Sequence, residues 1–328
     1  MHSVLEQQVL LHTQADSISK IERVQSLWSD FGSLERVWLN GCNMESIIIK
    51  RIAPPTKMHH PNGWNTDASA QRKLKSYQVE CYWYEHYAKK LNDGLRVPRF
   101  LFSFEAGGTI ILGMEDLLCS GFIQSYNTSQ NCFDRCLEWL AKFHAFHLNV
   151  EPEGLWKVGT YWHLDTRQEE WEAMKDEDLK GAASQIDSVL NQCKYQTLVH
   201  GDAKPANFCF TADFSQVAAV DFQYVGRGCG LKDVIYLMSS TLSEGELFRE
   251  DQNIIKKYFR FFEKYLRLYS ISNVNFDTLK SEWQGLYSLV WSDFDRFLSS
   301  WNPSSKRVNG YMSMQSKKAL MQLNEDVE

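Results

Sequence analysis

The chain of 328 residues lacks any cluster of lysine and arginine, and its formal net charge is -6. Binding to a nucleic-acid backbone requires clustered basic side chains, so the sequence argues against nucleic acid as a partner. The chain also lacks an apolar run of about 20 residues, the length that spans a bilayer, and its first residues do not resemble a signal peptide. We therefore expect a cytoplasmic protein with no membrane partner.

Closely paired cysteines are also absent. The eight cysteines are scattered, and Cys132 and Cys136 fall one helical turn apart, which is typical of a helix rather than half of a zinc site. We expect reduced thiols. Composition is that of a globular protein, with 44% apolar and 23% charged residues. Aromatic residues reach 13%, enough to line a ligand pocket as well as a core.

The amino-terminal part has short strand-like runs. Asn40-Gly41 separates the second and third runs and suits a tight hairpin turn, which predicts an antiparallel meander. The polar stretch 53–70 predicts a surface loop, and it is followed by a helical pattern. The predicted strands are 21–27, 34–39, 46–52, 97–104 and 109–114, and the predicted helix is 71–91.

The carboxyl-terminal part is helical in pattern. Apolar positions recur at helical spacing from Phe133 onward, and two stripes, over 247–266 and 283–301, follow Ser243. The length allows two lobes, each with its own core. The sequence thus predicts an α+β protein with an antiparallel β amino lobe and a mainly helical carboxyl lobe.

Three polar residues stand at short intervals in the middle of the chain. His200-Gly201-Asp202 is followed five residues later by Asn207, and Asp221-Phe222-Gln223 follows an apolar run. Phosphoryl transfer needs a carboxylate that accepts the proton of the attacking hydroxyl and oxygen ligands for Mg²⁺. Asp202 suits the first role, and Asn207 and Asp221 suit the second. Read separately, they are a turn residue, a cap and a strand end, but their joint spacing favours catalysis.

This pattern resembles the signature of the aminoglycoside-phosphotransferase and choline-kinase superfamily, which has a protein-kinase-like two-lobed fold. Protein kinases have arginine at the position of Gly201 and a long activation segment, whereas Asp233 and an apolar helix follow here almost at once. The resemblance implies ATP as the phosphate donor, Mg²⁺ as the metal and a small hydroxyl-bearing molecule as the acceptor. It also implies an amino lobe over 1–117, with the hinge at 114–117, and a carboxyl lobe over 118–328.

The resemblance assigns partners in the amino lobe. Lys50 ends an isoleucine run where this superfamily has the lysine that contacts the nucleotide phosphates, and Glu80 resembles the acidic residue that orients it. Glu85 remains a competing choice. In the hinge, backbone groups of Glu115 and Leu117 would meet the adenine edge.

Two further segments are weaker signals. Residues 28–33 would form the phosphate-covering turn, but their single glycine departs from the glycine-rich loop of protein kinases. His144 and His147 have the spacing of a metal pair, yet both lie on an apolar face without an evident third ligand. Residues 140–145 instead resemble the superfamily's helix that supports the catalytic loop.

A narrower resemblance concerns the run 291–298 with Trp301-Asn302-Pro303 and the earlier Lys75-Ser76-Tyr77. These resemble the ecdysteroid-kinase-like (CHK-like) branch, whose members phosphorylate hydroxyls of diverse small molecules. We expect the acceptor to bind against the 283–301 helix, with Trp291 and Asp293 on opposite margins of its apolar stripe. The alternative is a helix packed as core, with Asp293 solvated.

The sequence specifies neither the acceptor nor the oligomeric state. A rival function is a catalytically silent nucleotide-binding scaffold. The glycine-poor turn permits it, and the retained Asp202, Asn207 and Asp221 argue against it.

Overall fold

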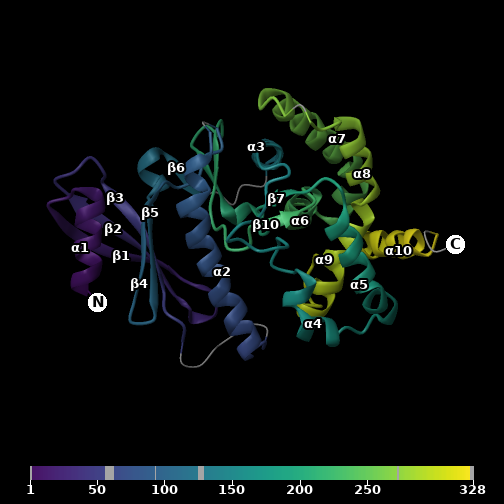
Figure 1. Ribbon diagram of the computed structural model, residues 1–328, viewed down its shortest axis with the longest axis horizontal. Helices are drawn as coiled ribbons and strands as arrows, with labels where there is room; N and C mark the ends of the chain where they lie inside the picture. Colours follow the sequence, from purple (N-terminus) through teal and green to yellow (C-terminus); the bar gives the residue numbers. More distant parts are fainter. Residues whose placement is uncertain (1, 56–62, 93, 125–128, 272, 326–328) are drawn as a thin grey trace. The chain divides into compact units, whose positions relative to one another are not determined.

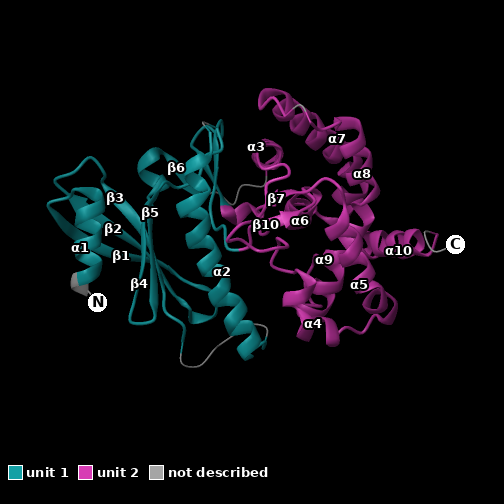
Figure 2. Ribbon diagram, viewed as in Figure 1, with its two compact units in different colours: residues 1–125, 208–223 teal, residues 126–207, 224–328 magenta. Residues whose placement is uncertain are grey.

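The computed structural model describes residues 2–55, 63–92, 94–124, 129–271 and 273–325. The chain divides into two compact units, 1–125 with 208–223 and 126–207 with 224–328 (Figure 2). Strands β6 (Phe122–Gln124), β8 (Phe208–Thr211) and β9 (Val217–Ala219) form one antiparallel sheet, which joins the segment 208–223 to the first unit. The first unit therefore extends beyond residue 117 and includes a later segment of the chain. The boundary between the lobes after residue 117 stays a prediction.

The first unit contains a five-stranded antiparallel sheet with strand order β1-β2-β3-β5-β4. The predicted meander is confirmed, because the first three strands pair in sequence order. Gly41 follows β2 with a φ of 77°, the left-handed conformation that glycine adopts readily. The strands are β1 (Ser17–Ser26), β2 (Gly32–Asn40), β3 (Ser46–Ile52), β4 (Phe100–Ala106) and β5 (Thr109–Glu115).

Two helices cover the sheet, α1 (His2–Thr13) and α2 (Asp67–His86) (Figure 1). Alternate residues of a strand point to opposite faces. Ile47 and Ile49 of β3 accordingly share a core cluster with α1, whereas Ile52 packs with Tyr77 of α2. Lys50 lies on the α2 face by the same alternation. The sequence did not predict α1, and residues 56–62 of the predicted loop lie outside the described residues.

Helix α2 begins four residues before the predicted start because Thr66 caps it, its side chain accepting from the backbone N–H of Ser69 at 3.2 Å. The polar run before Gln71 thus belongs partly to the helix.

The second unit is mainly helical, with a short β7 (Thr197–Val199) paired to β10 (Gly226–Gly228). Its central α9 packs against α5, α6 and α10. The prediction of one continuous helix over 283–301 is wrong. The apolar stripe is divided between two helices, which are separated at Leu286. The helices are α3 (Gln130–Phe146), α4 (Gln168–Glu172), α5 (Glu177–Gln192), α6 (Leu231–Thr241), α7 (Glu244–Leu268), α8 (Phe276–Gly285), α9 (Tyr287–Trp301) and α10 (Gly310–Glu325).

The predicted α+β class, with an antiparallel sheet toward the amino terminus and helices toward the carboxyl terminus, is confirmed. No helix in the described parts of the chain combines the length and the apolar character needed to cross a bilayer.

Candidate active site

The catalytic loop predicted from the sequence directly follows β7. Gly201 has a φ of 81°, and a Cβ atom at this position would lie 2.2 Å from the carbonyl oxygen of Tyr224. Any other residue would meet both a strained backbone and a clash with main-chain atoms. The glycine is therefore required for the sharp turn from which Asp202 extends.

Asp202 and Asn207 are brought together within this loop. The Asn207 Nδ2 donates to the backbone oxygen of Asp202 at 2.8 Å and to its Oδ2 at 3.0 Å. Because these bonds use the amide nitrogen, the amide oxygen of Asn207 is directed away from Asp202. Lys204, which the sequence did not single out, donates from Nζ to the same Oδ2 at 2.8 Å. Both Asp202 and Asn207 are buried.

A second carboxylate, whose role the sequence did not indicate, anchors the backbone of this loop. Asp233 of α6 is fully buried and accepts from the backbone N–H of His200 at 2.6 Å and of Gly201 at 2.9 Å. The Nε2 of His144 lies 3.0 Å from Asp233 Oδ2, so this histidine has a structural partner. His147 instead bonds the carbonyl of Phe143. The available signal was the pair of charged residues, Lys232 and Asp233, at the start of an otherwise apolar helix.

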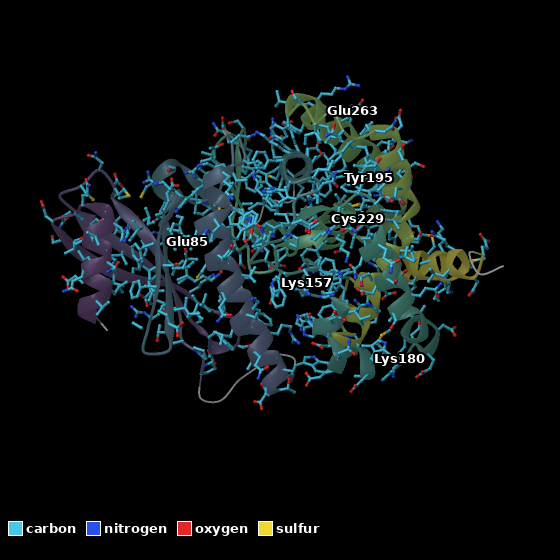
Figure 3. All side chains as sticks on the ribbon, in the orientation of Figure 1. Glu85, Lys157, Lys180, Tyr195, Cys229 and Glu263 are labelled. Atoms are coloured by element: carbon cyan, nitrogen blue, oxygen red, sulfur yellow. The ribbon has the colours of Figure 1, made fainter. Side chains whose placement is uncertain are left out.

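In the first unit, Lys50 contacts two predicted site residues. Its Nζ lies 2.6 Å from Glu80 Oε2 and 3.0 Å from Asp221 Oδ1. Of the two open alternatives on α2, the carboxylate that Lys50 contacts is therefore that of Glu80. Glu85 lies further along the same helix (Figure 3).

Burial and charge oppose each other in this cluster. Burial would lower the pKa of Lys50, but the carboxylates of Asp221 and Glu80 outweigh it and raise the pKa above its usual value. Burial raises the pKa of the Glu80 carboxyl to about 7, and the nearby Asp221 carboxylate adds to this rise, although Lys50 opposes it. The lysine therefore stays charged between the two carboxylates.

Asp221 has an unusual backbone conformation for a residue with a side chain. Its φ is 69°, in the left-handed region. This conformation costs free energy and persists only where the surroundings impose it. The next residue supplies an anchor, since the buried ring of Phe222 stacks on Trp83 of α2 with centroids 3.4 Å apart. Strain of this kind clusters at functional sites.

The predicted phosphate-covering turn is also strained. Ser29 and Asp30 have φ values of 57° and 59°, and a Cβ on Gly32 would lie 2.0 Å from the carbonyl oxygen of Arg51. The single glycine of the turn thus stands where a side chain cannot fit. Two successive left-handed residues give a backbone that can direct N–H groups toward an anion. The phosphate-covering role stays a prediction.

The predicted hinge, 114–117, begins within β5, whose last residue is Glu115. Burial would raise the pKa of Glu115, but hydrogen bonds from Arg96 and Ser120 hold it below its usual value. Its backbone N–H donates to the carbonyl of Arg99 at 2.9 Å, and its contact with adenine stays a prediction. Leu117 is the first residue of a short 3₁₀ helix, Leu117–Ser120, where backbone N–H groups lack partners within the helix.

The two predicted acceptor-binding residues lie elsewhere than expected. Trp291 and Asp293 are each 0% exposed, so neither is at a margin that meets solvent. Asp293 accepts from Trp162 Nε1 at 3.0 Å and pairs with Lys232 at 3.2 Å and Arg296 at 2.6 Å. Helical periodicity placed it beside the apolar stripe, but buried cations make the interior its most favourable position. Its part in acceptor binding stays a prediction.

The donor set fits Mg²⁺. This ion prefers oxygen ligands from one or two side chains, with the remaining positions filled by water and phosphate oxygens. The amide oxygen of Asn207 in the second unit and the carboxylate of Asp221 in the first are each groups of this kind, and their metal roles stay predictions. Among the described residues, no group of three His, Cys, Asp or Glu side chains forms a separate metal cluster.

Comparison with known proteins gives the family and the fold of the chain. Residues 62–268 match the phosphotransferase enzyme family. A thermostable variant of aminoglycoside phosphotransferase APH(4)-Ia, in ternary complex with ADP and hygromycin B, is similar in structure with a TM-score of 0.51. The two are 11% identical, over 97% of this chain and 98% of that chain. This similarity establishes the kinase-like fold.

Other solved structures are similar at lower scores. Plasmodium vivax ethanolamine kinase has a TM-score of 0.48 and 12% identity, over 92% of this chain and 82% of that chain. A Streptomyces rimosus aminoglycoside phosphotransferase in complex with ADP and streptomycin has a TM-score of 0.44 and 14% identity, over 79% and 90%. No curated protein sequence matches the chain significantly.

Proposed function

The chain belongs to the phosphotransferase enzyme family, and on this premise we propose that it moves the γ-phosphate of ATP to a hydroxyl group of a small molecule. The observation that carries this proposal is the fixed carboxylate of Asp202, which Asn207 and Lys204 hold in one orientation. A scaffold that only bound nucleotide would not need it.

Asp202 is the proposed proton acceptor. As the acceptor hydroxyl attacks the γ-phosphorus, Asp202 orients it and takes its proton, and the bond to the β-phosphate oxygen breaks. Lys204, bonded to Asp202, places a positive charge beside the reacting oxygens. Asp233 is a positioning residue, since it holds the two backbone amides that precede Asp202.

The residues of the first unit bind the donor in this proposal. Lys50 steadies the nucleotide phosphates, and Glu80 keeps its ammonium group in place. Asp221 of this unit and Asn207, which belongs to the second unit, are the proposed Mg²⁺ ligands, and the ion would neutralise charge on the phosphates when bound. The backbone groups of Glu115 and Leu117 receive the adenine edge.

The acceptor is proposed only as a hydroxyl-bearing small molecule of the kind that the ecdysteroid-kinase-like branch uses. The burial of Trp291 and Asp293 favours an indirect role for both, in shaping the second unit rather than in touching the acceptor. The eight free cysteines suit a reducing compartment, and we propose the cytoplasm.

Replacement of Asp221 by alanine is expected to weaken Mg²⁺-dependent nucleotide binding at least about tenfold, because the metal loses a carboxylate ligand. Calorimetric titration of the non-hydrolysable analogue AMP-PNP, with and without Mg²⁺, measures this. Affinity without the metal should change little. Asp213→Ala removes an exposed aspartate from the same unit and serves as the control. Unchanged Mg²⁺-dependent affinity in a folded Asp221→Ala protein would remove the metal role.

Acceptor-dependent release of ADP tests the whole proposal. The purified protein is incubated with ATP and Mg²⁺ against a library of hydroxylated metabolites and amino alcohols. ADP release with at least one acceptor is the expected result. A thermal shift with Mg²⁺ and ATP but no release with any acceptor would instead favour the nucleotide-binding scaffold, since ligand binding to the native state raises stability without turnover.

A further inference from the structure

Gln223, two residues after Asp221, is bonded at both ends of its amide. Its Oε1 accepts from Lys73 Nζ at 2.7 Å and from Ser76 Oγ at 3.1 Å. Its Nε2 donates to Asp221 Oδ1. Gln223 is only 4% exposed, so these bonds lie in an interior where they are strong. The side chain therefore has one orientation, with its oxygen toward α2 and its nitrogen toward Asp221.

The other contact of Asp221 also leads to α2. Its Oδ1 accepts from Lys50, and Lys50 is held by Glu80. Lys73, Ser76 and Glu80 stand at positions i, i+3 and i+7 and therefore share one face of the helix. Asp221 Oδ1 thus accepts from two donors, Lys50 and Gln223, and each donor is itself bonded to the same face of the helix.

We propose that this α2–Gln223 link, made of Lys73, Ser76 and Gln223, is a positioning device that fixes the Asp221 carboxylate for Mg²⁺. The proposal rests on the metal role of Asp221 in the proposed function. A left-handed backbone at Asp221 persists only where its surroundings impose it, and a carboxylate with a fixed rotation loses less freedom when it binds a metal.

Glutamine is the side chain that this position requires. The oxygen of the amide meets the ammonium group of Lys73, and its nitrogen meets the carboxylate of Asp221, so one neutral group bridges opposite charges. Glutamate would bond Lys73 but repel Asp221. An apolar side chain would leave both charged groups, which are partly buried, with one partner fewer.

The link is tested with Gln223→Leu and Lys73→Met by calorimetric titration of AMP-PNP at fixed and at zero Mg²⁺. Partners that orient metal ligands typically contribute about 10- to 100-fold in metal affinity, so Gln223→Leu should lower Mg²⁺-dependent affinity at least about tenfold. Lys73→Met should give a smaller loss, and the double variant should be no weaker than Gln223→Leu alone, because both changes break one chain of contacts. Affinity without Mg²⁺ should stay at the parental value, whereas a merely structural defect would lower both.

Lys75→Met is the matched control, since Lys75 is an exposed lysine on the same helix. It should leave both affinities unchanged. If Gln223→Leu does not fold, Lys73→Met and Ser76→Ala replace it. Parental Mg²⁺-dependent affinity in the folded link variants, with a loss in Asp221→Ala, would overturn the link and leave the proposed function standing. Parental affinity in Asp221→Ala as well would overturn both.

Discussion

Substitution of Asp202 by asparagine is expected to slow phosphoryl transfer by about 10²- to 10⁴-fold, the range that a positioned general base contributes. Asparagine keeps the shape of the side chain, but its amide cannot accept the proton of the acceptor hydroxyl. Lys204, which pairs with the carboxylate at 2.8 Å, would also lose its ionic partner. The initial rate of ADP release at saturating ATP and acceptor measures the effect.

ATP affinity is the internal control, because the substitution leaves Lys50 and Asp221 in place. Asp165→Asn is the external control. Asp165 belongs to the same unit, its side chain is 82% exposed, and the variant should keep the parental rate. Parental turnover in a folded Asp202→Asn protein would rule out Asp202 as the proton acceptor.

Replacement of Asp293 by alanine is expected to destabilise the protein by about 3–5 kcal/mol, the cost of removing one partner from a buried ion pair. The carboxylate neutralises Lys232 and Arg296, and each of these side chains is 1% exposed. Without Asp293, two buried cations would lack their counter-charge, and the indole N–H of Trp162 would lose its acceptor. The free energy of unfolding in urea measures the loss.

The neighbouring Asp295 provides a matched control on the same helix. It is also buried, but its side chain accepts hydrogen bonds from the hydroxyls of Ser299 and Ser316. Asp295→Asn keeps an oxygen acceptor for one of these hydroxyls, its amide nitrogen can donate to the other, and no ion pair is removed, so it should cost about 1 kcal/mol or less. Equal losses at the two positions would show that burial, rather than the pairing with Lys232 and Arg296, determines the cost.

The same cluster should contribute to acid sensitivity. Burial would raise the pKa of Asp293, but Lys232 and Arg296 outweigh it and lower the pKa to about 2. An unfolded aspartate titrates near about 3.9, so the native state binds this proton less readily than the unfolded state. The contribution of Asp293 is therefore complete above about pH 4 and is lost as the pH falls toward about 2. Urea denaturation across this range should show a shallower acid loss in Asp293→Asn than in the parent.

Local signals in the sequence were sufficient to predict the antiparallel meander and the position of the candidate catalytic loop. The strands of the meander have alternating side chains and a turn at Gly41, and these are properties of neighbouring residues. The contact between Asp202 and Asn207 also lies within one short loop. Patterns of this kind can be recognised without knowing which distant parts of the chain come into contact.

Contacts between distant residues could not be read in the same way. Asp233 lies 33 residues from His200, and Gln223 lies 150 residues from Lys73, so no local spacing reveals that they meet. Periodicity places Asp293 on a helix face, but it does not show that Asp293 forms an ion pair with Lys232 of another helix. The division between α8 and α9 was missed because the apolar stripe continues across Leu286.

Two aspartates, Asp202 and Asp233, determine the geometry of the proposed catalytic loop. A mutational scan that measures activity alone would not distinguish them. Asp202 is the proposed participant in the reaction, whereas Asp233 never meets a substrate and only binds the amides of His200 and Gly201. Loss of either would give an inactive protein. Inactivity alone therefore does not identify a chemical role in this chain, and a folded variant that still binds nucleotide is the evidence that separates a reacting group from the group that holds its loop.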